Sequence, residues 1–199
     1  MCNFNRNCLP QQGGGQLDSV SQVMMYRLQY RNFGTHESLV GNFTVDSDGT
    51  DHAGSHWFEL RKSGANPWTT FQEGTIAPDA NHRWMGSAAM DGDGNIAVGY
   101  SMTSATMFPS LRYTGRLATD AIGTMPQGEF NIVDGTGNQV IANRWGDYSQ
   151  ISVDPVDDHT FCTRASTSRR AACGKRASHL LRSLHYPSHR DRASCWVRN

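Results

Sequence analysis

The sequence predicts an all-β protein made of short antiparallel strands. Short segments rich in aromatic and β-branched residues alternate with Gly, Asp, Asn and Pro, and the chain of 199 residues contains 20 glycines. Asp- and Gly-rich turns separate these segments, and such residues accept the positive φ that tight hairpin turns require. No stretch of about 12 residues shows the 3.6-residue apolar period of an amphipathic helix.

The expected strands follow one another from residue 25 onward. They are residues 25–30, 38–45, 56–61, 68–72, 84–90, 96–102, 110–117, 129–133, 139–143 and 148–153, with a short last strand at 159–161. The clearest turns lie at 46–49, 62–64, 91–95 and 134–138.

An internal repeat indicates how the strands are organised. Residues 81–91 and 143–154 both begin with Asn, contain Arg-Trp and end at an Asp that opens a turn, and residues 38–46 form a fainter third copy. The closing residues Asp46, Asp91 and Asp154 lie 45 and 63 residues apart. This spacing brackets one propeller blade of roughly 40–50 residues plus an insertion. The sequence therefore predicts an incomplete β-propeller of about two to three four-stranded antiparallel blades with disordered termini. A small β-sandwich with coincidental similarity is the alternative.

Charge and composition together divide the chain into three parts. Residues 1–161 hold 9 Lys+Arg and 17 Asp+Glu, whereas residues 162–199 hold 9 Lys+Arg and a single acid, Asp191. We expect residues 1–23 to be a polar, disordered linker, residues 24–161 the partial propeller, and residues 162–199 a basic, poorly ordered tail. The five cysteines lie only in the two end parts, so the expected propeller uses no disulfide.

Five segments carry a resemblance to a known family: residues 28–37, 57–61, 77–87, 94–101 and 144–149. They resemble large secreted bacterial proteins with a sialidase-like (BNR-type) β-propeller. The resemblance covers about residues 24–161 and implies the fold and an extracellular or cell-surface location. The Asp-box pattern of sialidases, Ser-x-Asp-x-Gly-x-Thr-Trp, is met only in part by residues 47–50, which speaks against sialidase activity. The chain itself shows no signal peptide.

The tail departs from that family after Phe161. Where the family tends to continue with Trp-Tyr-Thr-x-Glu-Tyr, residues 162–167 read Cys-Thr-Arg-Ala-Ser-Thr. Loss of one G from the Trp codon can convert codons for the family's sequence into codons for the sequence of residues 162–167. We therefore expect residues 162–199 to be a frameshift product that leaves the last blade incomplete; the alternative is a basic tail that binds nucleic acid or anionic lipid.

Two Asp-rich turns predict a candidate calcium site. Alternate carboxylates and an amide, as in calcium loops, occur at Asp46, Asp48, Asp91, Asp93 and Asn95. The EF-hand ligand Glu is missing at position 12 of both loops, so simple Asp-Gly hairpins are the alternative. Calcium is the one candidate cofactor.

Polar residues on the loops before the repeated strands form the candidate active site. The candidate catalytic residues are His82, Asp79, Asp147 and Glu37, and the candidate substrate-binding residues are His36, Arg83, Arg112, Arg144 and Tyr148. If the repeated strands are the innermost of each blade, these residues meet at one mouth of the ring. In the alternative, they pack and hydrogen-bond neighbouring blades.

The functional prediction is an extracellular-type hydrolase propeller domain that acts on a sugar or on an ester or lactone, with Ca²⁺ assisting. The alternatives are a non-catalytic module that binds glycan or protein, and a fragment without evolved activity. Gly-x-Ser-x-Gly, His-Glu-x-x-His and the phosphate-binding Gly-x-x-x-x-Gly-Lys motifs are absent. We expect a small-molecule or glycan partner, no membrane span, no nucleic-acid partner, and self-association through an open blade edge.

Overall fold

The computed structural model describes residues 1–21, 23–169 and 172–181, and in these residues the chain is all-β without an α-helix. Three antiparallel sheets follow one another along the chain. The first has the order β3 (Gln29–Asn32), β4 (Glu37–Asp46), β5 (Ala53–Lys62) and β6 (Thr69–Ile76). The second contains β7 (His82–Met90), β8 (Ile96–Ser104), β9 (Met107–Arg116) and β10 (Glu129–Val133), and the third contains β11 (Gln150–Val153), β12 (Phe161–Arg169) and β13 (Ala172–Leu181).

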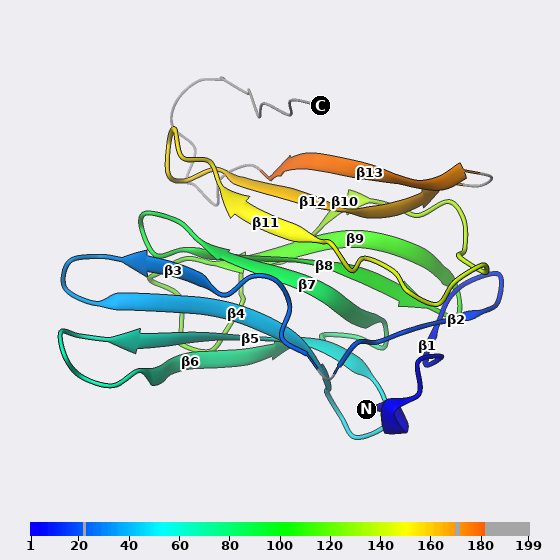
Figure 1. Cartoon of the computed structure of the whole chain (residues 1–199), viewed down its shortest axis with the longest axis horizontal. Helices are drawn as coiled ribbons and strands as arrows, with labels where there is room; N and C mark the ends of the chain where they lie inside the picture. Colours follow the sequence, from blue (N-terminus) through cyan, green and yellow to red (C-terminus); the bar gives the residue numbers. More distant parts are fainter. Residues whose placement is uncertain (22, 170–171, 182–199) are drawn as a thin grey trace.

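The three sheets are stacked face to face, with the second sheet in the middle (Figure 1). Nearly every residue of β7 and β8 is buried, because both faces of these strands are covered. Strand β5 instead alternates buried and half-buried residues over most of its length, as expected of a strand covered on one face.

Separate apolar clusters fill the two spaces between sheets. Val40 and Trp57 of the first sheet pack with Met90 and Val98 of the second. On the other side of the second sheet, Ala89 and Ala97 pack against residues of the third sheet, where Ile151 and Phe161 are the large members. Small residues on β7 and β8 allow the third sheet to approach closely.

The first strands of the three sheets run in the same direction. Along β7, Ser87 Oγ donates to Tyr26 O at 3.1 Å, just before β3, and Met90 N donates to Gln29 Oε1 at 2.9 Å, within β3. Ser87 Oγ also accepts from Ile151 N of β11 at 3.0 Å. Beyond the ends of β7 and β11, Gly92 N donates to the carbonyl of Asp158 at 2.8 Å.

This arrangement corrects one part of the predicted repeat. The copies at residues 81–91 and 143–154 become β7 and β11, which occupy equivalent positions. The fainter copy at 38–46 becomes β4, the second strand of its sheet, and β4 runs opposite to β7. His52, after the end of β4, bonds Asn81 O at the start of β7, whereas Arg31, paired with Ser38 at the start of β4, bonds Met90 O.

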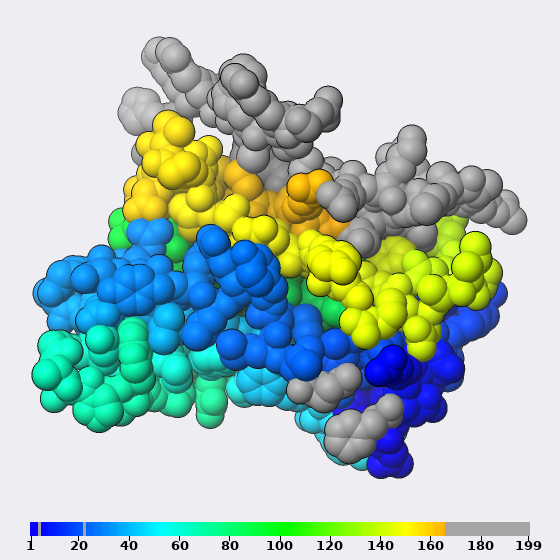
Figure 2. All heavy atoms as spheres, in the orientation of Figure 1, coloured from blue at the N-terminus to red at the C-terminus, as the bar shows by residue number. Residues whose placement is uncertain are grey.

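The N-terminal residues pack against the body. Two short strands, β1 (Leu9–Pro10) and β2 (Gln16–Leu17), pair with each other, and Leu9 and Leu17 are fully buried. Figure 2 shows this dark blue segment against the yellow-green loop that precedes β11. Gln11 bonds the backbone of Gln139 in that loop through both its amide oxygen and its amide nitrogen. The segment expected to be a disordered linker thus contributes to the core.

A short helical turn, η1 (Cys2–Phe4), opens the chain, and Cys2 and Cys8 form a disulfide with a Cα–Cα distance of 6.0 Å. Among the described residues, no helix has the length and hydrophobicity needed to cross a bilayer.

Several expected strands differ from the observed ones. Residues 129–133 form β10 as expected, whereas residues 139–143 are a loop rather than a strand. The tail was expected to leave the last blade incomplete. Residues 161–169 pair with β11 and residues 172–181 pair with β12, so within the described residues the third sheet has three strands, one fewer than the first two. The remaining tail, residues 182–199, lies outside the described residues, and the frameshift stays a prediction.

Candidate functional site

A buried arginine organises the start of the second sheet. Arg83, on β7, is fully buried, yet its guanidinium meets two carboxylates. Its Nε and Nη2 donate to Glu129 at 2.7 and 3.2 Å, and its Nη1 and Nη2 donate to Asp79 at 2.8 and 3.1 Å. Nη1 also donates to Asn81 O at 2.9 Å. These contacts use all five N–H groups of the Arg83 guanidinium, and they fix the orientation of both carboxylates.

Tyr100 completes this cluster from β8. Its hydroxyl donates to Glu129 Oε2 at 2.7 Å. Burial, followed by the charge of Glu129, raises the pKa of Tyr100, so the phenol stays protonated and acts as a donor. Glu129 is therefore held from two sides, by Arg83 and by Tyr100.

The charges of the cluster follow from these contacts. Hydrogen bonds from Arg83 lower the pKa of Asp79 to about 2. Burial alone would lower the pKa of Arg83, but the hydrogen bonds to Asp79 and Glu129 outweigh it and raise that pKa. Because Asp79 is ionised at neutral pH and Arg83 carries one positive charge, an ionised Glu129 leaves the cluster with one excess negative charge.

Glu129 and Tyr100 line a cleft between the first and second sheets. The cleft has a volume of about 400 Å³. Its apolar wall comes from Trp57, Ile76, Pro78 and Met125, and hydroxyl groups of threonines add polar atoms. The complete lining is Trp57, Thr75, Ile76, Ala77, Pro78, Tyr100, Thr114, Gly123, Thr124, Met125, Gly128 and Glu129. A mainly apolar wall with a few fixed polar groups is typical of small-ligand sites.

The loop between β9 and β10 forms one side of the cleft and is held by buried polar groups. Arg116 is buried at the end of β9 and donates to the carbonyls of Thr124 and Asp120 at 3.2 and 2.7 Å. Gly123 N bonds Gln72 Oε1 of β6 at 3.3 Å. These contacts set the width of the cleft, because they tie the loop to both sheets.

The structure brings only some of the predicted catalytic residues together. Asp79 and Arg83 belong to the cluster at the cleft. His82 lies next to them in sequence, but its Nδ1 accepts from Ala53 N at 3.2 Å and its ring meets the ring of His52 edge-on. Burial and then the nearby His52 lower the pKa of His82, so the imidazole is neutral at pH 7.

The residues before β11 form a separate surface group. Arg144 Nε donates to Asp147 Oδ2 at 2.9 Å, and this contact raises the pKa of Arg144. Tyr148 is 88% exposed. Arg112, on β9, bonds Asn131 and Asp134 at the outer edge of the second sheet. None of these contacts joins the groups to the Arg83 cluster.

His36 and Glu37 lie at the opposite end of the first sheet from His82. His36 immediately precedes β4 and Glu37 begins it, and β4 runs antiparallel to β7. Glu37 accepts from Tyr30 at 2.8 Å and pairs with Lys62 at 3.1 Å. A single mouth that includes Glu37, His82 and Asp147 is therefore not formed.

The carboxylates of Asp46, Asp48 and Asp91, which were predicted to bind calcium, accept hydrogen bonds from residues of their own turns. Asp46 accepts from the backbone N–H groups of Gly49 and Asp51, and Asp48 accepts from Thr50. In the second turn, Asp91 accepts from the backbone of Asp93 at 3.0 Å and from both nitrogens of Asn95 at 2.9 and 2.8 Å. In the described part of the chain, no three metal-binding side chains gather at one point. The geometry is that of Asp-capped hairpin turns.

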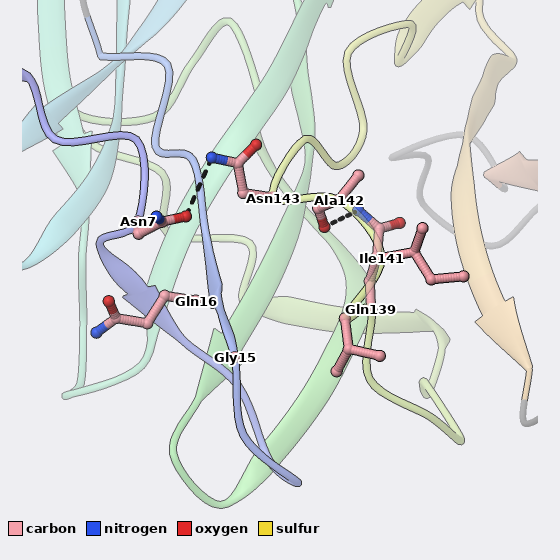
Figure 3. A pocket seen from close by; sticks show the side chains of 8 residues that line it. Asn7, Gly15, Gln16, Gln139, Ile141, Ala142 and Asn143 are labelled. Atoms are coloured by element: carbon pink, nitrogen blue, oxygen red, sulfur yellow. Dashed lines mark hydrogen bonds between the residues drawn. The ribbon is translucent and has the colours of Figure 1, made fainter.

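A second groove lies where the N-terminal segment meets the loop before β11 (Figure 3). Asn143 Nδ2 donates to Asn7 Oδ1 at 3.1 Å, and Gln139 Nε2 donates to Ala142 O at 2.9 Å. The described residues that line it carry amides and aliphatic groups without a titratable side chain: Asn7, Gly15, Gln16, Gln139, Val140, Ile141, Ala142 and Asn143. This groove lacks acid–base chemistry, so the cleft at Glu129 is the stronger candidate.

Sequence reasoning missed Glu129, Tyr100 and Trp57 as site residues. Glu129 begins the predicted strand 129–133 and Tyr100 lies within the predicted strand 96–102, so the sequence assigns each residue to the fold alone. Neither a family model nor a curated protein matches this chain.

Proposed function

We propose that this chain is a section of an extracellular β-propeller that binds a sugar-type ligand in the cleft at Glu129. The propeller part is supported by three consecutive sheets that stack face to face with their first strands in the same direction. Each of the first two sheets has four strands connected in simple up-and-down order, as in propeller blades. The extracellular location rests on the family resemblance described above.

One observation carries the binding proposal: a fixed carboxylate faces an apolar wall inside one cleft. Glu129 is oriented by Arg83 and Tyr100 before any ligand arrives, so little ordering is needed on binding. A sugar offers hydroxyl donors to such a carboxylate and apolar C–H faces to a wall that includes Pro78 and Met125.

The test is direct binding of neutral oligosaccharides to the full chain, first on a glycan array and then by calorimetry. Tyr100→Phe removes one hydroxyl that orients Glu129 and should weaken binding by about tenfold, the lower end of the loss for one hydrogen bond to a charged group. Thr50→Val, which removes a hydroxyl from a distant exposed turn, is the matched control. Array binding that Tyr100→Phe leaves unchanged, or no binding by a folded wild-type chain, would contradict the proposal.

A second candidate function is hydrolysis in the same cleft, of a glycosidic bond, an ester or a lactone. The observation that favours it is the partly exposed Glu129 carboxylate, 25% of whose side chain remains accessible. An ionised carboxylate there would act as a general base, taking a proton from the water that attacks the substrate. Aryl glycosides, aryl esters and lactones are the substrates to assay. Turnover abolished in Glu129→Gln but retained in Glu73→Gln, an exposed control, would favour the enzyme over the binding module.

A further inference from the structure

Another pocket, distinct from the cleft and from the groove at the N-terminal segment, lies at the far end of the first sheet from the cleft. It is formed by the β3–β4 turn, the end of β5 and the β5–β6 turn, and its volume is about 560 Å³. Strand β6 connects the two places, since it begins at the pocket and ends at the cleft. The lining is Thr35, His36, Arg61, Lys62, Ser63, Asn66, Pro67, Thr69 and Phe71. Two cations, an imidazole and several hydroxyl or amide groups therefore meet there.

Arg61 is held rigidly at this pocket. Its Nε donates at 2.5 Å to Glu59, a fully buried carboxylate that also accepts from Ser38 and Gln72. Its guanidinium carbon lies 3.5 Å from the centre of the Phe71 ring. Within the described residues, the two terminal nitrogens have no hydrogen-bond partner. A stacked guanidinium with free terminal N–H groups is pre-organised to donate two parallel hydrogen bonds.

Lys62 and His36 lie beside this guanidinium and are also positioned by neighbours. Lys62 Nζ is 3.1 Å from Glu37 and 5.2 Å from the centre of the Trp68 ring. His36 stacks on Phe33 with 4.9 Å between ring centres. Its Nδ1 is 3.1 Å from Thr35 Oγ1, and its Nε2 is buried without a partner in the described part of the chain.

We infer that this pocket binds an oxyanion group: a carboxylate, a sulfate or a phosphate. The donors match such a group, because a guanidinium offers paired N–H groups and an ammonium offers a point charge. When His36 Nδ1 accepts from Thr35, its Nε2–H becomes a further donor. Glu59 and Glu37 already balance the two cations, so recognition rests on the orientation of donors rather than on excess charge. This site is independent of the cleft at Glu129.

The experiment is an NMR titration of the isotope-labelled full chain with sulfate, phosphate and glucuronate, with chloride and glucose as controls at matched ionic strength. We expect saturable shifts in the His36 ring and in the amides of Ser63, Asn66 and Thr69. Lys62→Gln should weaken binding about tenfold or more, the usual loss for a hydrogen bond to a charged group. The exposed Arg6→Gln removes the same charge elsewhere and should leave binding within about twofold of wild type.

Comparing the three anions also shows which kind of ligand carries the oxyanion. Equal binding of sulfate, phosphate and glucuronate indicates recognition of the oxyanion alone, whereas binding of glucuronate only indicates an acidic sugar. The inference is overturned if no anion gives saturable shifts up to about 50 mM, well above the millimolar range of weak sites. Equal effects of Lys62→Gln and Arg6→Gln would overturn it as well. If Lys62→Gln does not fold, His36→Gln is measured against the same control.

Discussion

Replacing Arg83 by glutamine should destabilise the fold strongly. Arg83 is fully buried and makes five hydrogen bonds, two to Glu129, two to Asp79 and one to Asn81 O. The substitution keeps a polar side chain but leaves Glu129 without its cation. Removing one partner of a buried ion pair typically costs about 3–5 kcal/mol. Asp79 is half exposed and recovers water, so we place the loss in free energy of unfolding at the lower end, about 3 kcal/mol.

The measurement is equilibrium unfolding in urea followed by tryptophan fluorescence, because Trp57 and Trp84 are buried and report on the sheets around Arg83. Arg6→Gln, on an exposed arginine, should change the free energy of unfolding by less than about 0.5 kcal/mol. Arg83→Lys should also lose most of the stabilisation that Arg83 provides, since an ammonium cannot bridge two carboxylates in the same plane. A loss of less than about 1 kcal/mol in Arg83→Gln would refute the view that this cluster holds the second sheet to the loop before it.

Two further predictions test packing and charge. A Cβ added in Gly86→Ala would overlap the Asn42 side-chain amide across the first two sheets, so calorimetry should show a loss of about 1–3 kcal/mol, whereas Gly99→Ala, whose added carbon meets its nearest atom at 3.5 Å, should cost less than about 1 kcal/mol. Equal melting temperatures for the two variants would contradict the close approach at Gly86. The pKa of Asp79 falls from 3.8 to about 2 on folding. The ionised carboxylate therefore stabilises the folded state above pH 4, and this stabilisation is lost as the pH falls toward 2. That shift is worth about 2.4 kcal/mol in full, and about 1 kcal/mol after allowance for the exposure of the carboxylate. Urea unfolding of wild type and Asp79→Asn should therefore differ by about 1 kcal/mol at pH 5 and converge near pH 2, and a constant difference across that range would exclude Arg83 as the cause.

The all-β class and many strands could be predicted from the sequence. Aromatic and β-branched segments between Asp-Gly turns determine strands locally, and the turn at 91–95 is closed by its own residues, as Asp91 and Asn95 demonstrate. Local chemistry of this kind needs no tertiary partner. The repeat at 81–91 and 143–154 likewise predicted two equivalent strands, β7 and β11, because both copies carry Arg-Trp and end at an Asp that opens a turn.

The tertiary structure decided which residues meet. The fainter repeat at 38–46 reads like the other two, yet it runs in the opposite direction, and this sends Glu37 and His36 away from His82. Glu129 lies 46 residues from Arg83, and no local pattern marks the pair. The polar N-terminal segment also appeared unstructured, because its few apolar residues, Leu9 and Leu17, become core only against the rest of the chain. Turn chemistry is local and can be read from sequence, whereas strand direction, ion-pair partners and the cleft depend on contacts between distant segments.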